Sequence, residues 1–165
     1  MTTRSEARGQ RPQDRPEARG RRPEERPSHR SPVTLTELQE WGEDFGRRLS
    51  PPAIVTLEGD LGSGKTTLAQ AICRGVGIVE DVTSPTFSLV NEYQVGDSTL
   101  YHLDLYRLRG SGDLTNVGWD DIINSGGIVL IEWPERAGVL LPDESIRIRL
   151  EHIPGDDTRR QLILV

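Results

Sequence analysis

The sequence is poor in cysteine and in long apolar segments. Its 165 residues include one cysteine, Cys73, so no disulfide can form within the chain. It contains no run of 18 apolar residues and no hydrophobic stretch of the kind that a secretory signal requires. The length fits one domain, which we expect to be soluble and cytoplasmic, with no membrane partner and with Cys73 in its core.

The first part of the chain lacks the apolar side chains that a core requires. Residues 1 to 30 hold nine arginines, five acidic residues and four prolines, and they contain the tandem repeat EARGQRPQDRP-EARGRRPEERP. Such a segment cannot bury enough surface to offset the entropy of ordering. We therefore predict a disordered Arg/Pro-rich tail over residues 1–31 and a folded domain over 32–165. A passive extension explains the tail, and an arm that touches RNA is the alternative.

The predicted domain has an excess of negative charge. It carries 21 acidic and 11 basic residues, because 5 of the 26 acids and 9 of the 20 bases lie in the tail. A net charge of −10 would repel bare nucleic acid. If this domain serves RNA chemistry, we expect partner proteins to hold the RNA.

One glycine-rich stretch, GDLGSGKTT at residues 59–67, organises the rest of the sequence. It follows the apolar run AIVTL and precedes LAQAI, so it joins a predicted strand to a predicted helix. In that context G-x-x-x-x-G-K-[ST] is a P-loop, whose backbone N–H groups and helix N-terminus hold phosphate oxygens. We expect Lys65 to reach the outer phosphates and the Thr66 hydroxyl to bind Mg²⁺. The predicted nucleotide-binding residues of the loop are Asp60, Leu61, Gly62, Ser63, Gly64, Lys65, Thr66 and Thr67.

Lys65 is also the only lysine in the chain. A guanine-reading N-K-x-D motif needs a second lysine, so that motif is excluded. Adenine is favoured by default, and we take ATP with Mg²⁺ as the expected ligand.

The patterns before and around the P-loop predict an α/β domain. Thr34 and Glu37 form a capping box that begins an amphipathic helix, which ends near Ser50. Residues 53–58 form an apolar run without alternation, typical of a central strand covered on both faces. The next helix should span about 65–75, with Gly75 and Gly77 closing it.

The remaining segments predict a three-layer P-loop NTPase-like domain with a mixed, partly parallel sheet plus a β-hairpin. The hairpin should consist of residues 88–95 and 99–105, followed by short helices within 110–126. A second buried strand, residues 128–131, ends in Glu132. Strands at 146–153 and 160–165 should complete the sheet.

Acidic residues end two of the predicted strands. Ligands in open α/β sheets gather beyond the carboxyl ends of the strands, where a Walker B carboxylate holds Mg²⁺ or positions water. Glu132 ends the more apolar strand, so we give it the metal-linked role, and Asp104 becomes the candidate for positioning water or for a second metal contact. The alternative for each is an acid that caps the following turn. His102 shares the face of Asp104, and a structural histidine is the favoured interpretation for it.

Thr86 follows Thr83, Ser84 and Pro85 in a loop downstream of the P-loop. Segments that sense the γ-phosphate are found in this position of the fold. A plain Thr-Ser-Pro turn is the alternative.

Four motifs together resemble the TsaE family, also called the YjeE-type P-loop ATPases. The motifs are GDLGSGKTT at 59–67, TSPTF at 83–87, YHLDLYRL at 101–108 and IEWPER at 131–136. The resemblance covers about residues 33–152, leaves out the Arg-rich tail, and is loose over 114–123.

This resemblance implies a small ATPase needed for the threonylcarbamoyl modification of the adenosine beside the anticodon of certain tRNAs. Such proteins act with TsaD and TsaB and reach tRNA indirectly through them. The sequence shows no clear arginine finger, which fits slow intrinsic hydrolysis that partners complete. By position, Thr66 and Glu132 would handle Mg²⁺, Asp104 and Glu132 with Lys65 would be catalytic, and Thr86 and Trp133 would lie at the nucleotide. Weak self-association is a further expectation.

Two other functions stay open on the sequence. The first is a small-molecule or nucleoside kinase on the same scaffold, in which Asp104 would activate a substrate hydroxyl. The second is a non-hydrolysing, ATP-gated interaction module. ATP consumption without an acceptor separates hydrolysis from the kinase, and substitutions of Glu132 or Asp104 test the module.

Overall fold

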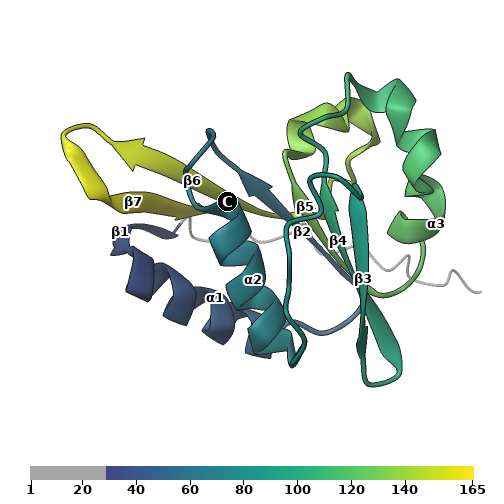
Figure 1. The fold of residues 1–165 in the computed structure, drawn as a ribbon, viewed down its shortest axis with the longest axis horizontal. Coiled ribbons are helices and arrows are strands. Elements are labelled where there is room, and N and C mark those ends of the chain that lie inside the picture. The colour runs from purple at the N-terminus through teal and green to yellow at the C-terminus, as the bar shows by residue number, and fades with distance from the viewer. Residues whose placement is uncertain (1–28) are drawn as a thin grey trace, which may run out of the picture.

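Seven strands form one mixed sheet in the order β1-β7-β6-β2-β5-β4-β3 (Figure 1). The computed structural model describes residues 29–165, and most of the predicted tail, residues 1–28, lies outside the described residues. The strands are β1 His29–Thr34, β2 Ala53–Glu58, β3 Val90–Val95, β4 Ser98–Asp104, β5 Ile128–Glu132, β6 Ile146–Ile153 and β7 Asp156–Leu164. The helices are α1 Leu35–Arg48, α2 Lys65–Val76 and α3 Trp119–Ile123, with 3₁₀ turns η1 Ser111–Val117, η2 Pro134–Arg136 and η3 Gly138–Leu140.

The strand that precedes the P-loop, β2, is the central strand, as its unbroken apolar run predicts. It pairs in parallel with β5 on one side and with β6 on the other, and β5 pairs in parallel with β4. The outer strands β1, β7 and β3 are antiparallel to their neighbours. Because β6, β2, β5 and β4 all run the same way, their carboxyl ends lie at one edge of the sheet.

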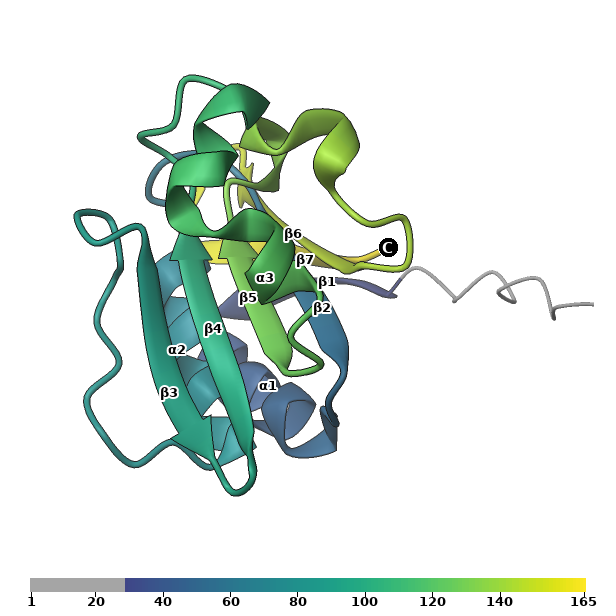
Figure 2. The ribbon, with the colours of Figure 1, turned by 90° about the vertical axis from the view of Figure 1, so that its right-hand side faces the viewer.

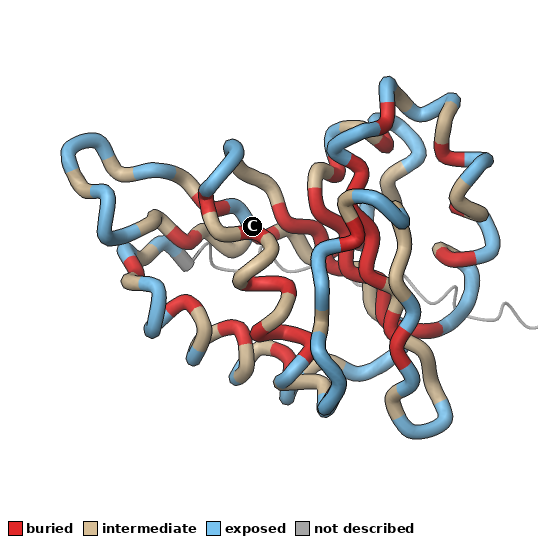
Figure 3. Tube along the Cα trace, viewed as in Figure 1, coloured by how far each residue is buried: buried red, intermediate tan, exposed pale blue. Residues whose placement is uncertain are grey.

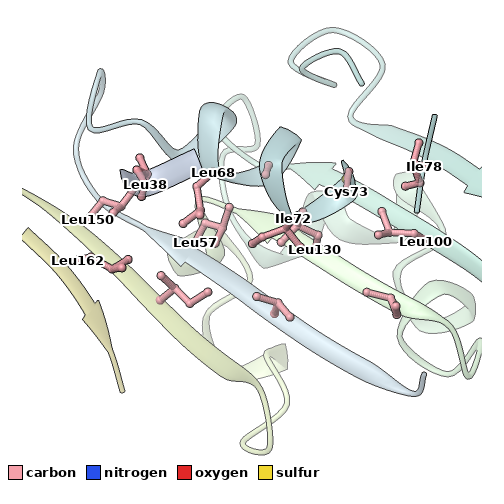
Figure 4. Packing of buried hydrophobic residues seen from close by; sticks show 14 of the residues in the cluster. Leu38, Leu57, Leu68, Ile72, Cys73, Ile78, Leu100, Leu130, Leu150 and Leu162 are labelled. Atoms are coloured by element: carbon pink, nitrogen blue, oxygen red, sulfur yellow. The ribbon is translucent and has the colours of Figure 1, made fainter. Parts of the chain in front are cut away.

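Helices cover both faces of the sheet, which confirms the predicted three-layer α/β arrangement (Figure 2). Helices α1 and α2 pack on one face over a cluster that includes Leu57, Ile72 and Leu130 (Figure 4). A second cluster, with Leu103 and Ile131, lies on the face that carries α3. Buried residues concentrate along the central strands (Figure 3). Among residues 29–165, no helix has both the length and the apolar character needed to cross a bilayer.

Cys73 belongs to the cluster under α2, as predicted. Its side chain is fully buried. Burial raises the pKa of the thiol from 9.0 to about 12, and the nearby charge of Glu132 acts in the same direction. Cys73 is therefore an unreactive core residue at neutral pH.

Two parts of the sheet differ from the sequence expectations. Strand β1, His29–Thr34, is not predicted at all, and its residues 29–31, which the sequence assigns to the tail, pair with β7. Strand β7 begins at Asp156 instead of residue 160, because Gly155 turns with φ 78° and Asp156 accepts hydrogen bonds from Thr158. The turn is thus tighter, and the strand longer, than its polar sequence indicates.

Helix α2 continues to Val76 and is capped by Gly77 with φ 107°, which confirms one of the two glycines predicted to close it; the other, Gly75, lies within the helix. Gly75 instead lies where α2 crosses α1. A Cβ atom on Gly75 would overlap the carbonyl of Glu43, and one on Gly46 would overlap the carbonyl of Ile72. The two helices therefore depend on glycine for their close approach.

We expect Gly75→Ala to lower the free energy of unfolding by about 1–3 kcal/mol, the usual cost of overpacking. Helix propensity alone predicts the opposite sign, a gain of about 1 kcal/mol. Urea unfolding measures the difference, with Glu40→Ala at an exposed position of α1 as the control. A Gly75→Ala variant more stable than the wild type would contradict the close helix crossing.

Candidate functional site

Residues 59–64 turn sharply from the end of β2 into the first turn of α2. Gly59 adopts φ 142°, and a Cβ atom there would overlap the carbonyl of Leu150 and crowd the Ser63 hydroxyl. Gly64 precedes the helix with φ 105°, and no described side chain caps the helix N-terminus. The loop therefore places backbone N–H groups and the positive end of the helix dipole at one point, which suits a bound phosphate.

Lys65 lies across the loop that precedes it. Its Nζ donates to the carbonyl oxygens of Gly59 at 2.7 Å and Asp60 at 2.9 Å, and it lies 3.7 Å from the centre of the Trp133 ring. The side chain is buried, and this burial lowers the pKa of the ammonium from 10.5, while Glu132 and other acids oppose that effect. Lys65 is thus a partly desolvated cation beside the loop.

Thr66 and Glu132 meet between α2 and β5. The Thr66 hydroxyl donates to Glu132 Oε2 at 3.0 Å, and Glu132 is 1% exposed. Hydroxyl and carboxylate oxygens are the hard ligands that Mg²⁺ takes when phosphates supply the others. The residues present therefore fit a magnesium ion bound with a nucleotide.

Asp104 lies beside Glu132 in the register of β4 and β5. Thr86 donates to its Oδ2 at 2.7 Å, Ser84 is at 3.5 Å from the same oxygen, and the N–H of Tyr106 donates to its Oδ1 at 3.0 Å. The Ser84 and Thr86 hydroxyls are 2.6 Å apart. The loop before β3 is therefore tied to a strand-end carboxylate.

Most of the sequence-predicted site residues line one open cavity of about 380 Å³. They are Leu61, Gly62, Gly64, Lys65, Thr66, Thr67, Thr86, Asp104, Glu132 and Trp133. Two predicted residues lie outside it: Asp60 lines a neighbouring cavity of about 920 Å³, and the buried Ser63 hydroxyl has no hydrogen-bond partner among the described residues.

Trp133 forms a wall of both cavities. It adopts φ 59°, a left-handed conformation that is strained for a bulky residue. Its ring contacts that of Tyr106, with centroids 4.8 Å apart. Such strain, held by packing beside a lysine, is typical of a functional position.

Sequence reasoning missed two features of the site. His102 Nε2 lies 2.9 Å from Glu132 Oε1, a contact that the predicted structural role of this histidine did not include. The alternation of His102 with Asp104 was the available signal. A further cavity of about 370 Å³ adjoins Gly62–Gly64 and Thr67. Its other walls come from distant segments and include Thr34, Leu35, Leu38, Asp157, Thr158 and Arg160.

Fold and loop together define a P-loop domain of the α/β class. Residues 33–162 match the model of one family, described as threonylcarbamoyl adenosine biosynthesis protein TsaE. The chain belongs to the TsaE family, which confirms the resemblance noted from its motifs.

Individual relatives agree with this assignment. The tRNA threonylcarbamoyladenosine biosynthesis protein TsaE of Nostoc sp. is 44% identical over 120 residues, which are 71% of this chain and 72% of the relative. The protein of the same name from Treponema pallidum is 40% identical over 110 residues, 67% of this chain and 81% of the relative. The crystal structure of Bacillus subtilis YdiB superposes with a TM-score of 0.69 at 29% identity, covering 83% of this chain and 84% of that one.

The lowered pKa of Lys65 predicts that its charge costs folding free energy at pH 7. This cost fades as the pH rises from the lowered pKa toward 10.5, because the folded and then the unfolded side chain become neutral. We therefore expect Lys65→Met to melt at or above the wild-type temperature at pH 7, where about 2–4 °C corresponds to 1 kcal/mol. The melting temperature of the wild type should rise relative to that of the variant as the pH is raised.

Thermal melts of the ligand-free protein between pH 7 and 10.5 measure this difference. Arg109→Met, which removes an exposed cation, controls for the loss of one positive charge. A Lys65→Met variant that melts lower than wild type by the same amount at every pH would show that the contacts of Lys65 to the backbone carbonyls outweigh its burial.

Proposed function

We propose that this chain binds and hydrolyses ATP with Mg²⁺ and supports tRNA threonylcarbamoyladenosine formation together with TsaD and TsaB. The tRNA would be held by those partners, in the cytoplasm. The observation that carries the proposal is the convergence of two strand-end carboxylates, Asp104 and Glu132, on the P-loop that bears Lys65 and Thr66. Family membership supports the pathway.

Each residue has a role that its position supports. The loop amides and Lys65 would bind the phosphate oxygens and stabilise charge that builds up during transfer. Thr66 and Glu132 would hold Mg²⁺, which neutralises phosphate charge when bound. Asp104, fixed by Thr86 and Tyr106, would orient the water that attacks the γ-phosphate in line.

The cavity beside Gly62–Gly64 would receive the adenosine. It shares the loop with the cavity of the carboxylates but is lined by neither Asp104 nor Glu132, so phosphates bound on the loop would leave it free for the nucleoside. Leu35 and Leu38 supply apolar surface, and Thr34, Asp157 and Thr158 supply polar atoms. Apolar walls with a few convergent polar groups are typical of ligand sites.

Incubation of the purified protein with Mg-ATP in water tests hydrolysis directly. Release of phosphate without any acceptor supports the proposal. Turnover that appears only when a hydroxyl substrate is added would favour a small-molecule or nucleoside kinase, and tight ATP binding without turnover, even with TsaD and TsaB, would favour an interaction module.

We expect Asp104→Asn to retain Mg-ATP binding and to lower kcat about 10²–10⁴-fold, the contribution usual for a group that handles a proton of the attacking nucleophile. Single-turnover phosphate release measures the loss of hydrolysis rate, and a separate titration with Mg-ATP measures binding. Asp97→Asn, in the exposed β3–β4 turn at the other end of the hairpin, is the control. Equal loss of affinity and kcat would assign Asp104 to binding instead.

Exposed apolar side chains around the site support the proposal of protein partners. Eight large apolar side chains are exposed within residues 29–165, and five of them surround the site: Leu61, Phe87, Tyr106, Val139 and Leu140. Four of these follow the carboxyl ends of parallel strands, and Phe87 lies in the loop before β3, next to Thr86, which contacts Asp104. We call these five residues the apolar rim. Leu61 and Tyr106 line the nucleotide cavity, and Val139 lines its neighbour. Exposed apolar patches mark interaction sites, so a partner seated here would cover the nucleotide.

Val139→Ser should weaken binding of the TsaD–TsaB pair about tenfold or more, because a side chain 97% exposed alone would be buried in the complex. The affinity of the Val139→Ser variant for ATP, measured without the pair, should equal that of the wild type. Val79→Ser is a matched control, since Val79 is equally exposed. It follows the carboxyl end of the 12-residue helix α2, about 18 Å along the helix axis from the P-loop end.

Titration of the purified pair against each variant measures the affinity. If both variants bind the pair like the wild type, the partner surface lies elsewhere. If the wild type fails to bind the pair, the proposed partners are wrong.

A further inference from the structure

His102 is a fully buried histidine to which the proposed function assigns no part. It lies on β4, two residues before Asp104, and therefore on the same face of the strand. Its ring is 0% exposed, and the Glu132 carboxylate that it contacts is almost equally buried. Buried polar atoms are usually satisfied by other protein atoms, and the contact between these two side chains satisfies one atom of each.

The register of the sheet explains how the two side chains meet. In the parallel pairing of β4 with β5, His102 lies opposite Leu130 and Asp104 lies opposite Glu132. His102 and Glu132 are thus diagonal neighbours on one face, a separation that long side chains can bridge. The imidazole ring spans it and places Nε2 at 2.9 Å from Oε1 of Glu132.

The two oxygens of Glu132 are held from different elements. His102 on β4 holds Oε1, and the Thr66 hydroxyl on α2 holds Oε2 at 3.0 Å. A glutamate side chain has three torsions, so one contact still leaves several rotamers accessible. A second contact, on the other oxygen, removes rotamers that the first contact allows. With Oε1 engaged by the ring, Oε2 remains directed at the Thr66 hydroxyl, where the proposed magnesium ligands converge.

The two nitrogens of the His102 ring have different surroundings. His102 Nδ1 has no hydrogen-bond partner among the described residues, while Nε2 faces a carboxylate oxygen. An ionised carboxylate can only accept, so holding Glu132 through this contact requires the hydrogen on Nε2.

We propose that His102 is a positioning residue that fixes Glu132 for the bound magnesium–nucleotide complex. This inference rests on the proposed function, because it concerns the same metal-linked carboxylate. Partners of this kind behind a metal ligand typically change metal affinity or activity by about 10–100-fold when they are removed.

Two amide substitutions that differ only in reach test the role. The Nε2 of glutamine is as many bonds from Cβ as the Nε2 of histidine, so His102→Gln can still donate to Glu132. His102→Asn ends one bond earlier and cannot reach. Both leave a buried polar amide, so a general effect on folding should be similar in the two variants, and thermal melts check this.

The main measurement is binding of a fluorescent ATP analogue at increasing Mg²⁺ and, separately, in excess chelator. We expect the Mg²⁺ concentration for half-maximal binding to rise about 10–100-fold in His102→Asn and to stay close to the wild type in His102→Gln. Affinity in chelator should be the same in all three proteins, because the P-loop is unchanged. His102→Asn with wild-type Mg²⁺ dependence would overturn the positioning role alone, whereas a wild type without Mg²⁺-dependent binding would overturn the proposed function with it.

A second readout does not involve the nucleotide. The ¹⁵N-resolved imidazole spectrum of the ligand-free wild type, with the His102 signals identified by their absence in His102→Gln, should show a hydrogen on Nε2. A His102 ring whose Nε2 lacks a hydrogen would overturn the proposal even if both variants bind Mg²⁺ weakly.

Discussion

Parallel pairing of β4, β5 and β2 is the constraint on which the site depends. It places Asp104 opposite Glu132, and Glu132 opposite Leu57, the last residue but one before the P-loop. A shift of one residue in either pairing would turn the carboxylate to the opposite face of the sheet, away from α2. The buried faces of these strands specify the register, because Leu130 and Leu100 pack under α2 while Val129 and Ile131 pack on the other side. The apolar core and the polar site are therefore fixed by one pattern of hydrogen bonds.

Several groups in the site are unfavourable for folding and are stabilised by their neighbours. Glu132 is buried, accepts a hydrogen bond from Thr66 and contacts His102 Nε2 at 2.9 Å, and Asp104 accepts hydrogen bonds from Thr86 and Tyr106. Lys65 keeps two carbonyl contacts, although burial lowers its pKa. Such networks are costly when one member is lost, since the remaining polar groups stay buried without partners. Substitution of a residue that does not itself touch the ligand is therefore expected to disturb the side chains that do.

Local signals in the sequence predicted the elements well, and long-range packing limited the rest. The capping box at Thr34, the apolar run of β2 and the P-loop glycines each act through neighbours in the chain, so they could be read directly. Gly75 was predicted to end the helix, whereas it lies where the backbone of α1 contacts α2. No residue near Gly75 in the sequence signals that contact. For the same reason, His102 was not predicted to contact Glu132. Its partner Glu132 is 30 residues away, and only the β4–β5 register brings the two together.

The distribution of charged side chains explains why phosphate binding at this site would depend on backbone N–H groups. A domain with a net charge of −10 would bind a triphosphate using the only lysine of the chain. Two arginines at this edge of the sheet are engaged elsewhere, since Arg149 pairs with Glu58 at 2.7 Å and Arg107 lies 4.4 Å from the centre of the Phe87 ring. The loop amides, the N-terminus of α2 and Mg²⁺ would then supply much of the favourable charge. Because amides and dipoles act only at close range, binding on the proposed function would tolerate little change in the glycine turn, whereas the acidic surface around it would keep free nucleic acid away.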